Sequence, residues 1–160
     1  MSRMHAPRRI GSVELPPIDQ VGYVVRNLDE TVARYEHLFG PFTFMESPLT
    51  GVLYRGKPSD VTLRIAFGSA GNVEIEFIEV VSGRSPHQEF LDAGREGIHH
   101  IRYRVPDCDR TIAALAGEGF APIWYHDMGF AKFAYLEHAS RDGVLLELLE
   151  MPGAPAPASR

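Results

Sequence analysis

A degenerate internal sequence repeat constrains the fold of this 160-residue chain more than any other feature. The second half contains the segment Gly97–Val105, and Ile18–Val25 is a degenerate copy of it. Superposing His100 on Gln20 also aligns Ile98 with Ile18, Ile101 with Val21, Tyr103 with Tyr23, Val105 with Val25, Asp109 with Asp29, Thr111 with Thr31, Ile112 with Val32 and Ala113 with Ala33. Two modules of one plan are the simplest explanation of this match.

A second pair of segments, Val73–Glu79 and Val144–Glu150, matches in the same way. Their superposition places Glu147 on Glu76 and Glu150 on Glu79. Each module therefore begins and ends with a segment that has a counterpart in the other module.

The residue pattern predicts a strand, a helix and three more strands in each module. In the first module we expect strands at 18–25, 42–45, 52–54 continuing after a turn at 56–58 into 61–67, and 73–80, with a helix from Asn27 or Asp29 to about Leu38. The predicted buried face of that helix consists of Leu28, Val32, Tyr35, Leu38 and Phe39. In the second module we expect strands at 98–105, 122–126, 133–136 and 144–149, with a helix at about 108–117.

These elements predict an α+β fold in which two fused βαβββ modules form a curved mixed sheet. We expect one domain over residues 16–150, with module 1 at about 16–82, a linker with a short helix at about 83–96, and module 2 at about 97–150. Residues 1–15 lack periodicity and residues 151–160 are rich in proline and alanine, so both ends are expected to be flexible.

The bulk composition excludes several classes of protein. A formal net charge of −5 argues against a nucleic-acid-binding surface, and no apolar run approaches the length of a membrane span. The single cysteine, Cys108, excludes an intramolecular disulfide and a thiolate metal cluster. We therefore expect a cytoplasmic protein that interacts with neither nucleic acid nor membrane.

Alternation along the strands places unusual polar groups on one face. His100, Arg102 and Arg104 share the face opposite the apolar positions of their strand, and this face is expected to line the concave side of the sheet. Burying three such groups without partners would be costly, so they require a partner there. Glu147 likewise lies between two leucines on its own face.

The repeat relates four potential metal ligands, which are Gln20, Glu76, His100 and Glu147. Taken singly, each is more often a packed or solvated side chain than a functional one. Taken together, each module supplies one N or O donor and one carboxylate, and the four can meet across a pseudo-twofold axis. One imidazole and three oxygen donors suit a divalent ion such as Zn²⁺, Ni²⁺, Co²⁺, Mn²⁺ or Fe²⁺.

The repeat and its motifs at 18–21, 73–77, 97–105 and 143–148 resemble the vicinal oxygen chelate superfamily, most closely the methylmalonyl-CoA epimerases. The resemblance implies a central metal site with His100, and not His99, as a ligand. Epimerases carry histidine where this chain has Gln20, and the Gln/Glu/His/Glu set resembles glyoxalase I of the human type.

The resemblance implies a metal-dependent isomerase or epimerase that acts through a metal-stabilised enolate on a small carbonyl or acyl-CoA substrate. Glu147 is the expected base and Glu76 its partner. Arg102 and Arg104 are expected to bind an anionic group of the substrate, or else to pair with Glu74, Glu79 or Glu150. Trp124 and Phe130 are candidates for the apolar walls of the substrate site.

Two other functions fit the same residues. The ligand set favours a lactoylglutathione lyase of the glyoxalase I type, and some relatives are metal-free proteins that bind and sequester small molecules such as drugs. The superfamily resemblance also implies a homodimer.

Overall fold

Both modules fold as a strand, a helix and three strands in the computed structural model, which describes residues 8–152. Module 1 comprises β3 (Gln20–Val24), α1 (Leu28–Phe39), β4 (Thr43–Tyr54), β5 (Lys57–Ala70) and β6 (Val73–Gly83). Module 2 comprises β7 (Gly97–Arg104), α3 (Cys108–Ala116), β8 (Phe120–Asp127), β9 (Lys132–His138) and β10 (Leu145–Glu150). The short helix α2 (Pro86–Asp92) joins them, and the fold is α+β, as the repeat predicts.

The two module helices begin in the same way, which explains several of the aligned residues. The side chains of Asn27 and Asp107 each accept a hydrogen bond from the backbone N–H three residues further on, as N-cap residues do. Glu79 and Glu150 each accept the N–H of the first residue of the same helices. These carboxylates neutralise unpaired N–H groups at the positive end of each helix.

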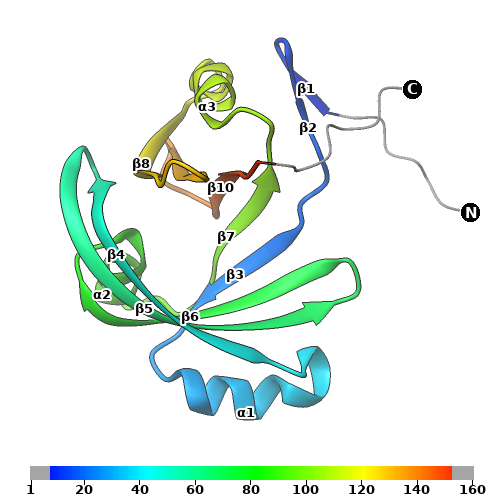
Figure 1. Ribbon diagram of the computed structural model, residues 1–160, viewed down its shortest axis with the longest axis vertical. Coiled ribbons are helices and arrows are strands. Elements are labelled where there is room, and N and C mark those ends of the chain that lie inside the picture. Colours follow the sequence, from blue (N-terminus) through cyan, green and yellow to red (C-terminus); the bar gives the residue numbers. More distant parts are fainter. Residues whose placement is uncertain (1–7, 153–160) are drawn as a thin grey trace, which may run out of the picture.

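The eight module strands close into a barrel in the order β10-β7-β3-β6-β5-β4-β8-β9, so the curved sheet expected from the sequence meets its own edge. The pairs β3–β6 and β7–β10 are parallel and the other pairs are antiparallel, which makes the sheet mixed, as expected. The modules meet along the β3–β7 pairing and again where β4 pairs with β8. The second pairing is short: within residues 8–152 it consists of Leu53 opposite Tyr125 and Tyr54 opposite Trp124. Figure 1 shows α1 and α3 at opposite ends of the molecule, and α2 packs against β6 and β3.

The second strand of module 1 is longer than predicted. The segments expected at 42–45 and 52–54 belong to the single strand β4. A β-bulge between Leu49 and Val52 hides this continuity, because the pattern of alternation breaks there. The chain then turns at residues 55–56 into β5, close to the turn expected at 56–58.

Three apolar clusters fill the barrel and cover it. The interior cluster consists of Val24, Val52, Val61, Leu63, Ile65, Ile78, Phe90, Leu91, Ile123, Trp124 and Tyr135. Since Phe90 and Leu91 belong to α2, this linker helix packs into the barrel interior. Outer clusters lie under α3 and under α1, where Leu28, Val32, Tyr35 and Phe39 pack as predicted. Leu38, predicted to be buried with them, is 59% exposed, because the apolar stripe is one residue narrower than the sequence suggested.

The N-terminal segment differs from the expectation of flexibility. Arg8–Ile10 (β1) and Val13–Leu15 (β2) form an antiparallel hairpin, and Leu15 packs in the cluster beneath α3. Strands of three residues are too short to show periodicity, which is why the pattern missed them.

Residues 1–7 and 153–160, including most of the tail expected to be flexible, lie outside the described residues. Among the helices of residues 8–152, none is long and apolar enough to cross a membrane.

Replacing Leu15 with alanine tests whether this hairpin contributes to stability. We expect Leu15→Ala to lower the free energy of unfolding by about 2–4 kcal/mol, because it removes a buried leucine from a packed cluster. Urea denaturation measures the change, and Arg8→Ala on the exposed first strand is the control. Equal midpoints for Leu15→Ala and the wild type would contradict the packing described here.

Candidate functional site

The four predicted ligands lie on four adjacent strands, β6, β3, β7 and β10, and face the inside of the barrel. The strand registers arrange the inward residues of these strands in two rows across the sheet. The first row is Glu74, Gln20, Arg102 and Glu147, and the second is Glu76, Gly22, His100 and Leu145. All of them come from one chain, so a site at this place needs no second copy.

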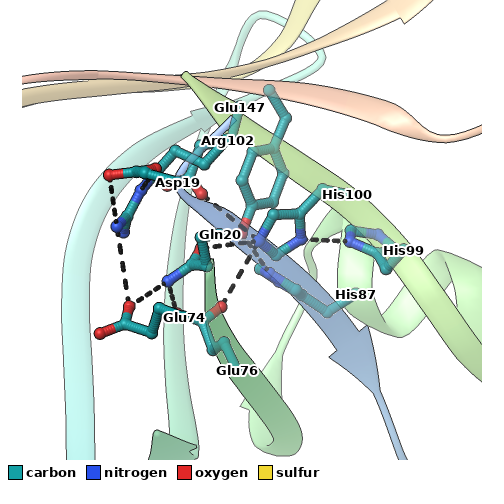
Figure 2. Close-up of polar contacts among 10 residues, drawn as sticks. Asp19, Gln20, Glu74, Glu76, His87, His99, His100, Arg102 and Glu147 are labelled. Carbon is teal, nitrogen blue, oxygen red and sulfur yellow. Dashed lines mark hydrogen bonds and ion pairs between the residues drawn. The ribbon is translucent and has the colours of Figure 1, made fainter. Parts of the chain in front are cut away.

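Three oxygen donors converge on one nitrogen, Nε2 of His100. Gln20 Oε1 lies 3.4 Å from it, Glu147 Oε2 3.3 Å and Glu76 Oε1 3.5 Å. Figure 2 shows these contacts radiating from the imidazole. Gln20 and His100 are fully buried, and the side chains of Glu76 and Glu147 are 10% and 12% exposed, so the carboxylates form the accessible side of the cluster.

The amide of Gln20 is oriented by two carboxylates. Its Nε2 donates to Glu74 Oε1 at 2.7 Å and to Glu76 Oε2 at 3.1 Å. Because the nitrogen is held in this way, the amide oxygen faces His100. Every atom that meets Nε2 of His100 is therefore a hydrogen-bond acceptor, and the centre of the cluster favours a cation.

The charge state of His100 reflects this environment. Burial alone would lower its pKa, but hydrogen bonds and charge interactions with Glu147 and Glu76 outweigh burial and raise the pKa to about 9. Without a metal ion, the imidazole is thus protonated at neutral pH. A proton on Nε2 then supplies the positive charge that the surrounding oxygens require.

The donor chemistry fits a divalent metal ion, although the arrangement is not that of a formed metal site. Within residues 8–152, no three His, Cys, Asp or Glu side chains are positioned to hold a metal ion together. A site here therefore depends on the amide oxygen of Gln20 as well. In a metal site with bonds of about 2.1 Å, neighbouring ligand atoms lie roughly 3.0–3.4 Å from one another. The distances from Nε2 of His100 to the three oxygens are close to this range.

The neighbouring His99 lies inside the barrel as well, which alternation did not predict. The register between β3 and β7 shifts between Gly22 and Tyr23, so that His99 is an extra residue in a β-bulge. Its Nδ1 lies 3.1 Å from Nδ1 of His100, and its Nε2 lies 3.3 Å from the carbonyl oxygen of Pro86 in α2. Burial lowers the pKa of His99 well below its usual value, so this ring is neutral.

The imidazole of His100 is held between two surfaces. On one side lies the backbone of Gly22, where an added Cβ would stand 2.0 Å from Cε1 and 2.2 Å from Nε2 of the ring. On the other side the ring of Tyr135 stacks on it, with centroids 4.8 Å apart. Sequence reasoning identified neither residue, because their roles depend on which strands become neighbours.

The two arginines beside the ligands share one carboxylate, that of Asp19. Arg102 donates from Nε and Nη2 to its two oxygens at 2.9 and 3.1 Å, and Arg104 Nε lies 3.0 Å from it. Arg102 also approaches Glu74 at 3.6 Å. The sequence predicted that the arginines pair with Glu74, Glu79 or Glu150. Of these three carboxylates, only Glu74 lies near Arg102, and the pairing with Asp19 was not predicted. The Nη1 group of Arg102 has no hydrogen-bonding partner within the described residues.

The aromatic residues predicted to bind substrate lie elsewhere. Trp124 is buried in the interior cluster and packs edge-on against Tyr54 and His87. Phe130 is 64% exposed in the loop between β8 and β9. The structure does not bring the two together beside His100, and a role for either in substrate binding stays a prediction.

Gly22→Ala tests the close approach of His100 to the sheet. We expect a loss of about 1–3 kcal/mol in the free energy of unfolding, since the new methyl group overlaps a ring that is fixed on both sides. In a His100→Ala background the same change should cost little, because the ring is absent. Urea denaturation of the four proteins of this double-mutant cycle measures the coupling, and additive effects would contradict the described contact.

Comparison with known proteins agrees with this architecture. The profile of the Glyoxalase/Bleomycin resistance protein/Dioxygenase superfamily matches residues 19–135. The uncharacterized protein YqjC of Bacillus subtilis (strain 168) is 26% identical over 139 residues, which cover 85% of this chain and 93% of YqjC.

Solved structures share the fold, as two of them illustrate. Hypothetical protein BH1468 of Bacillus halodurans C-125 is 25% identical, with a TM-score of 0.60 over 88% of this chain and 98% of its own. A variant of the Streptomyces coelicolor methylmalonyl-CoA epimerase, bound to 2-nitronate-propionyl-CoA, is 22% identical, with a TM-score of 0.62 over 89% and 99%. Because the family profile matches well over half of the chain, the chain belongs to the Glyoxalase/Bleomycin resistance protein/Dioxygenase superfamily.

Proposed function

We propose that this protein is a divalent-metal-dependent isomerase or epimerase that acts through an enolate on a small carbonyl or acyl-CoA substrate. The observation that carries the proposal is the convergence of Gln20, Glu76 and Glu147 on Nε2 of His100. A cluster of buried acceptors around one nitrogen is costly without a positive charge at its centre, which a bound cation would supply.

Gln20, Glu76, His100 and Glu147 would hold the ion, and Zn²⁺, Ni²⁺, Co²⁺, Mn²⁺ and Fe²⁺ all suit this donor set. A divalent ion supplies Lewis acidity, which lowers the energy of negative charge that develops on a carbonyl oxygen. The protein supplies the donors, their orientation and a largely dry environment.

The two glutamates provide a route for a proton. Glu76 is on β6 and Glu147 on β10, and the strands β3 and β7 separate them. A substrate carbon held over β3 and β7 would have one carboxylate on either side. Glu147 can then remove the carbon-bound proton and Glu76 can return one to the opposite side, which inverts the configuration of that carbon.

Arg102 provides a binding group for a substrate anion. Asp19 occupies its Nε and Nη2, which fixes the guanidinium beside Gln20 and Glu147 and leaves Nη1 available. A free guanidinium edge recognises a carboxylate. This supports a substrate with a carboxylate near its acidic carbon, such as methylmalonyl-CoA, and the epimerases of the same fold support the same choice.

A glutathione-dependent lyase is the second candidate, and the orientation of Gln20 favours it. The amide oxygen is turned toward His100 by two hydrogen bonds. This orientation suits a metal ligand and so supports the Gln/Glu/His/Glu set that resembles glyoxalase I. Such an enzyme would also move a proton between adjacent carbons with the help of a carboxylate base.

Metal binding is the first test. We expect the wild-type protein to take up about one equivalent of Zn²⁺ or Ni²⁺, with proton release at neutral pH, because the metal displaces the proton of His100. The apparent affinity should rise with pH up to the pKa of His100, about 9. Calorimetric titration measures both effects.

Variants of the four ligands define the site of uptake. Gln20→Ala, Glu76→Ala, His100→Ala and Glu147→Ala should each weaken binding, and His100→Ala should do so most strongly because it removes the central donor. Glu150→Gln is the control, since Glu150 accepts the Cys108 N–H at the start of α3 and glutamine can still accept that bond. Stoichiometric metal in all four alanine variants would overturn the assignment.

Hydrogen exchange distinguishes the reactions. In deuterated water we expect the metal-loaded protein to exchange the acidic proton of methylmalonyl-CoA, and Glu147→Gln to slow exchange by about 100-fold or more, since it removes the base. Glu150→Gln should exchange at the wild-type rate. NMR follows the exchange directly.

The same assay with the glutathione hemithioacetal of methylglyoxal tests the lyase, which would form product from it. If neither substrate reacts and the metal-free protein binds an apolar ligand tightly, the sequestering function is correct and both enzymatic candidates are wrong.

A further inference from the structure

The linker helix α2 is connected to the central histidine by a chain of hydrogen bonds. The carbonyl oxygen of Pro86 contacts Nε2 of His99, and Nδ1 of His99 contacts Nδ1 of His100. Both histidine rings are almost completely buried, at 3% and 0% exposure. Water therefore does not compete for these bonds, and each atom must be either donor or acceptor to the partner described.

The ends of this chain determine where its protons lie. A carbonyl oxygen only accepts, so the proton of His99 must be on Nε2. A neutral His99 then has a bare Nδ1, which accepts the N–H of Nδ1 of His100. With its proton on Nδ1, a neutral His100 presents the lone pair of Nε2 to Gln20, Glu76 and Glu147.

Without this chain, the opposite arrangement of His100 would be preferred. Nε2 of His100 lies beside the carboxylates of Glu76 and Glu147, and a neutral imidazole in that place would donate Nε2–H to them. That tautomer cannot bind a metal through Nε2. An acceptor on the Nδ1 side is needed to oppose it, and His99 is the group in that position.

The helix α2 also fixes the plane of the same ring by a second route. His87 of α2 forms a hydrogen bond of 3.0 Å with the hydroxyl of Tyr135, and the ring of Tyr135 stacks on His100. His87 and His99 stack on each other with centroids 5.1 Å apart. Both contacts place α2 behind the ligand, on the side away from the three oxygen donors (Figure 2).

We propose that His99 is a positioning residue, which carries the hydrogen bond from the Pro86 carbonyl of α2 to His100 and so holds Nε2 of His100 free for a metal ion. The proposal rests on the metal-dependent function proposed above and deepens it. The bulge in β7 has a purpose in this view, because it turns His99 into the barrel beside the ligand.

Two substitutions separate positioning from simple packing. His99→Phe keeps a ring that can pack between His87 and Phe90 but removes both nitrogens. His99→Asn loses the ring but places an amide oxygen near the position of Nδ1, where it can accept from His100. If His99 only packs, the phenylalanine variant should retain more of the zinc affinity. If His99 positions His100, the asparagine variant should retain more of it.

Zinc affinity and the tautomer of His99 are the two measurements. We expect His99→Phe to weaken zinc binding by about 10- to 100-fold and His99→Asn by about threefold or less. In the metal-free wild type at neutral pH, ¹⁵N NMR should show the proton of His99 on Nε2 and a bare Nδ1. A proton on Nδ1 of His99, or equal zinc affinity in the two variants, would overturn the proposal.

The two readouts also distinguish this inference from the proposed function. A wild-type protein that takes up no zinc contradicts the metal-dependent function and removes the ligand that His99 would serve. A protein that binds zinc but carries the His99 proton on Nδ1 keeps the function and contradicts the positioning role. Circular dichroism of both variants confirms that each is folded.

Discussion

The antiparallel pairing of β3 with β7 is the contact on which the candidate site depends. It places Gly22 opposite His100 and Gln20 opposite Arg102, on the inner face of the barrel. The parallel pairings of these strands with β6 and β10 then bring Glu76 and Glu147 to either side. A shift of either strand by one residue would turn its inward side chains to the outer face and away from those of its partner, so the register itself determines whether the site exists.

The electrostatics of the site follow from this crowding. Four carboxylates meet here, those of Asp19, Glu74, Glu76 and Glu147. Within the described residues, two guanidinium groups, those of Arg102 and Arg104, form ion pairs with this group, through Asp19 and Glu74. Partly buried carboxylates need compensating charge, because desolvation opposes their ionised form. The high pKa of His100 is one response to that imbalance, and a metal ion at the same place would be another. Under the proposed function, a proton and a metal ion would therefore compete for the same lone pair of His100.

The sequence predicted the plan of the fold and the residues that converge, because both depend on the repeat. Pairing His100 with Gln20 and Glu147 with Glu76 requires only that the two modules share one plan. The closure of the barrel, the bulge at His99 and the stacking of Tyr135 were not predictable in this way. Each depends on which strands become neighbours or on a break in the alternation of side chains along a strand. The alternating pattern of apolar and polar residues in a sequence carries no information about either. The need for Gly22 is visible only once the imidazole lies across it.

The two modules orient their central donors by different means, although their backbones are equivalent. The superposition of His100 on Gln20 places His99 on Asp19, and that of Glu147 on Glu76 places Leu145 on Glu74.

In module 2, the residue before the donor orients it, since His99 bonds to His100 and Leu145 has no polar group to offer. In module 1, the residue before the donor holds two arginines instead, and the orienting role passes to Glu74 on the neighbouring strand.

Gly22 and Arg102 occupy equivalent positions of the two modules, and they differ for the same reason. The large imidazole of His100 leaves no room for a side chain opposite it, whereas the glutamine, oriented from β6, leaves room for Arg102. The departure from symmetry therefore places a guanidinium group beside the proposed metal ligands, and it does so on one side of the pseudo-twofold axis alone.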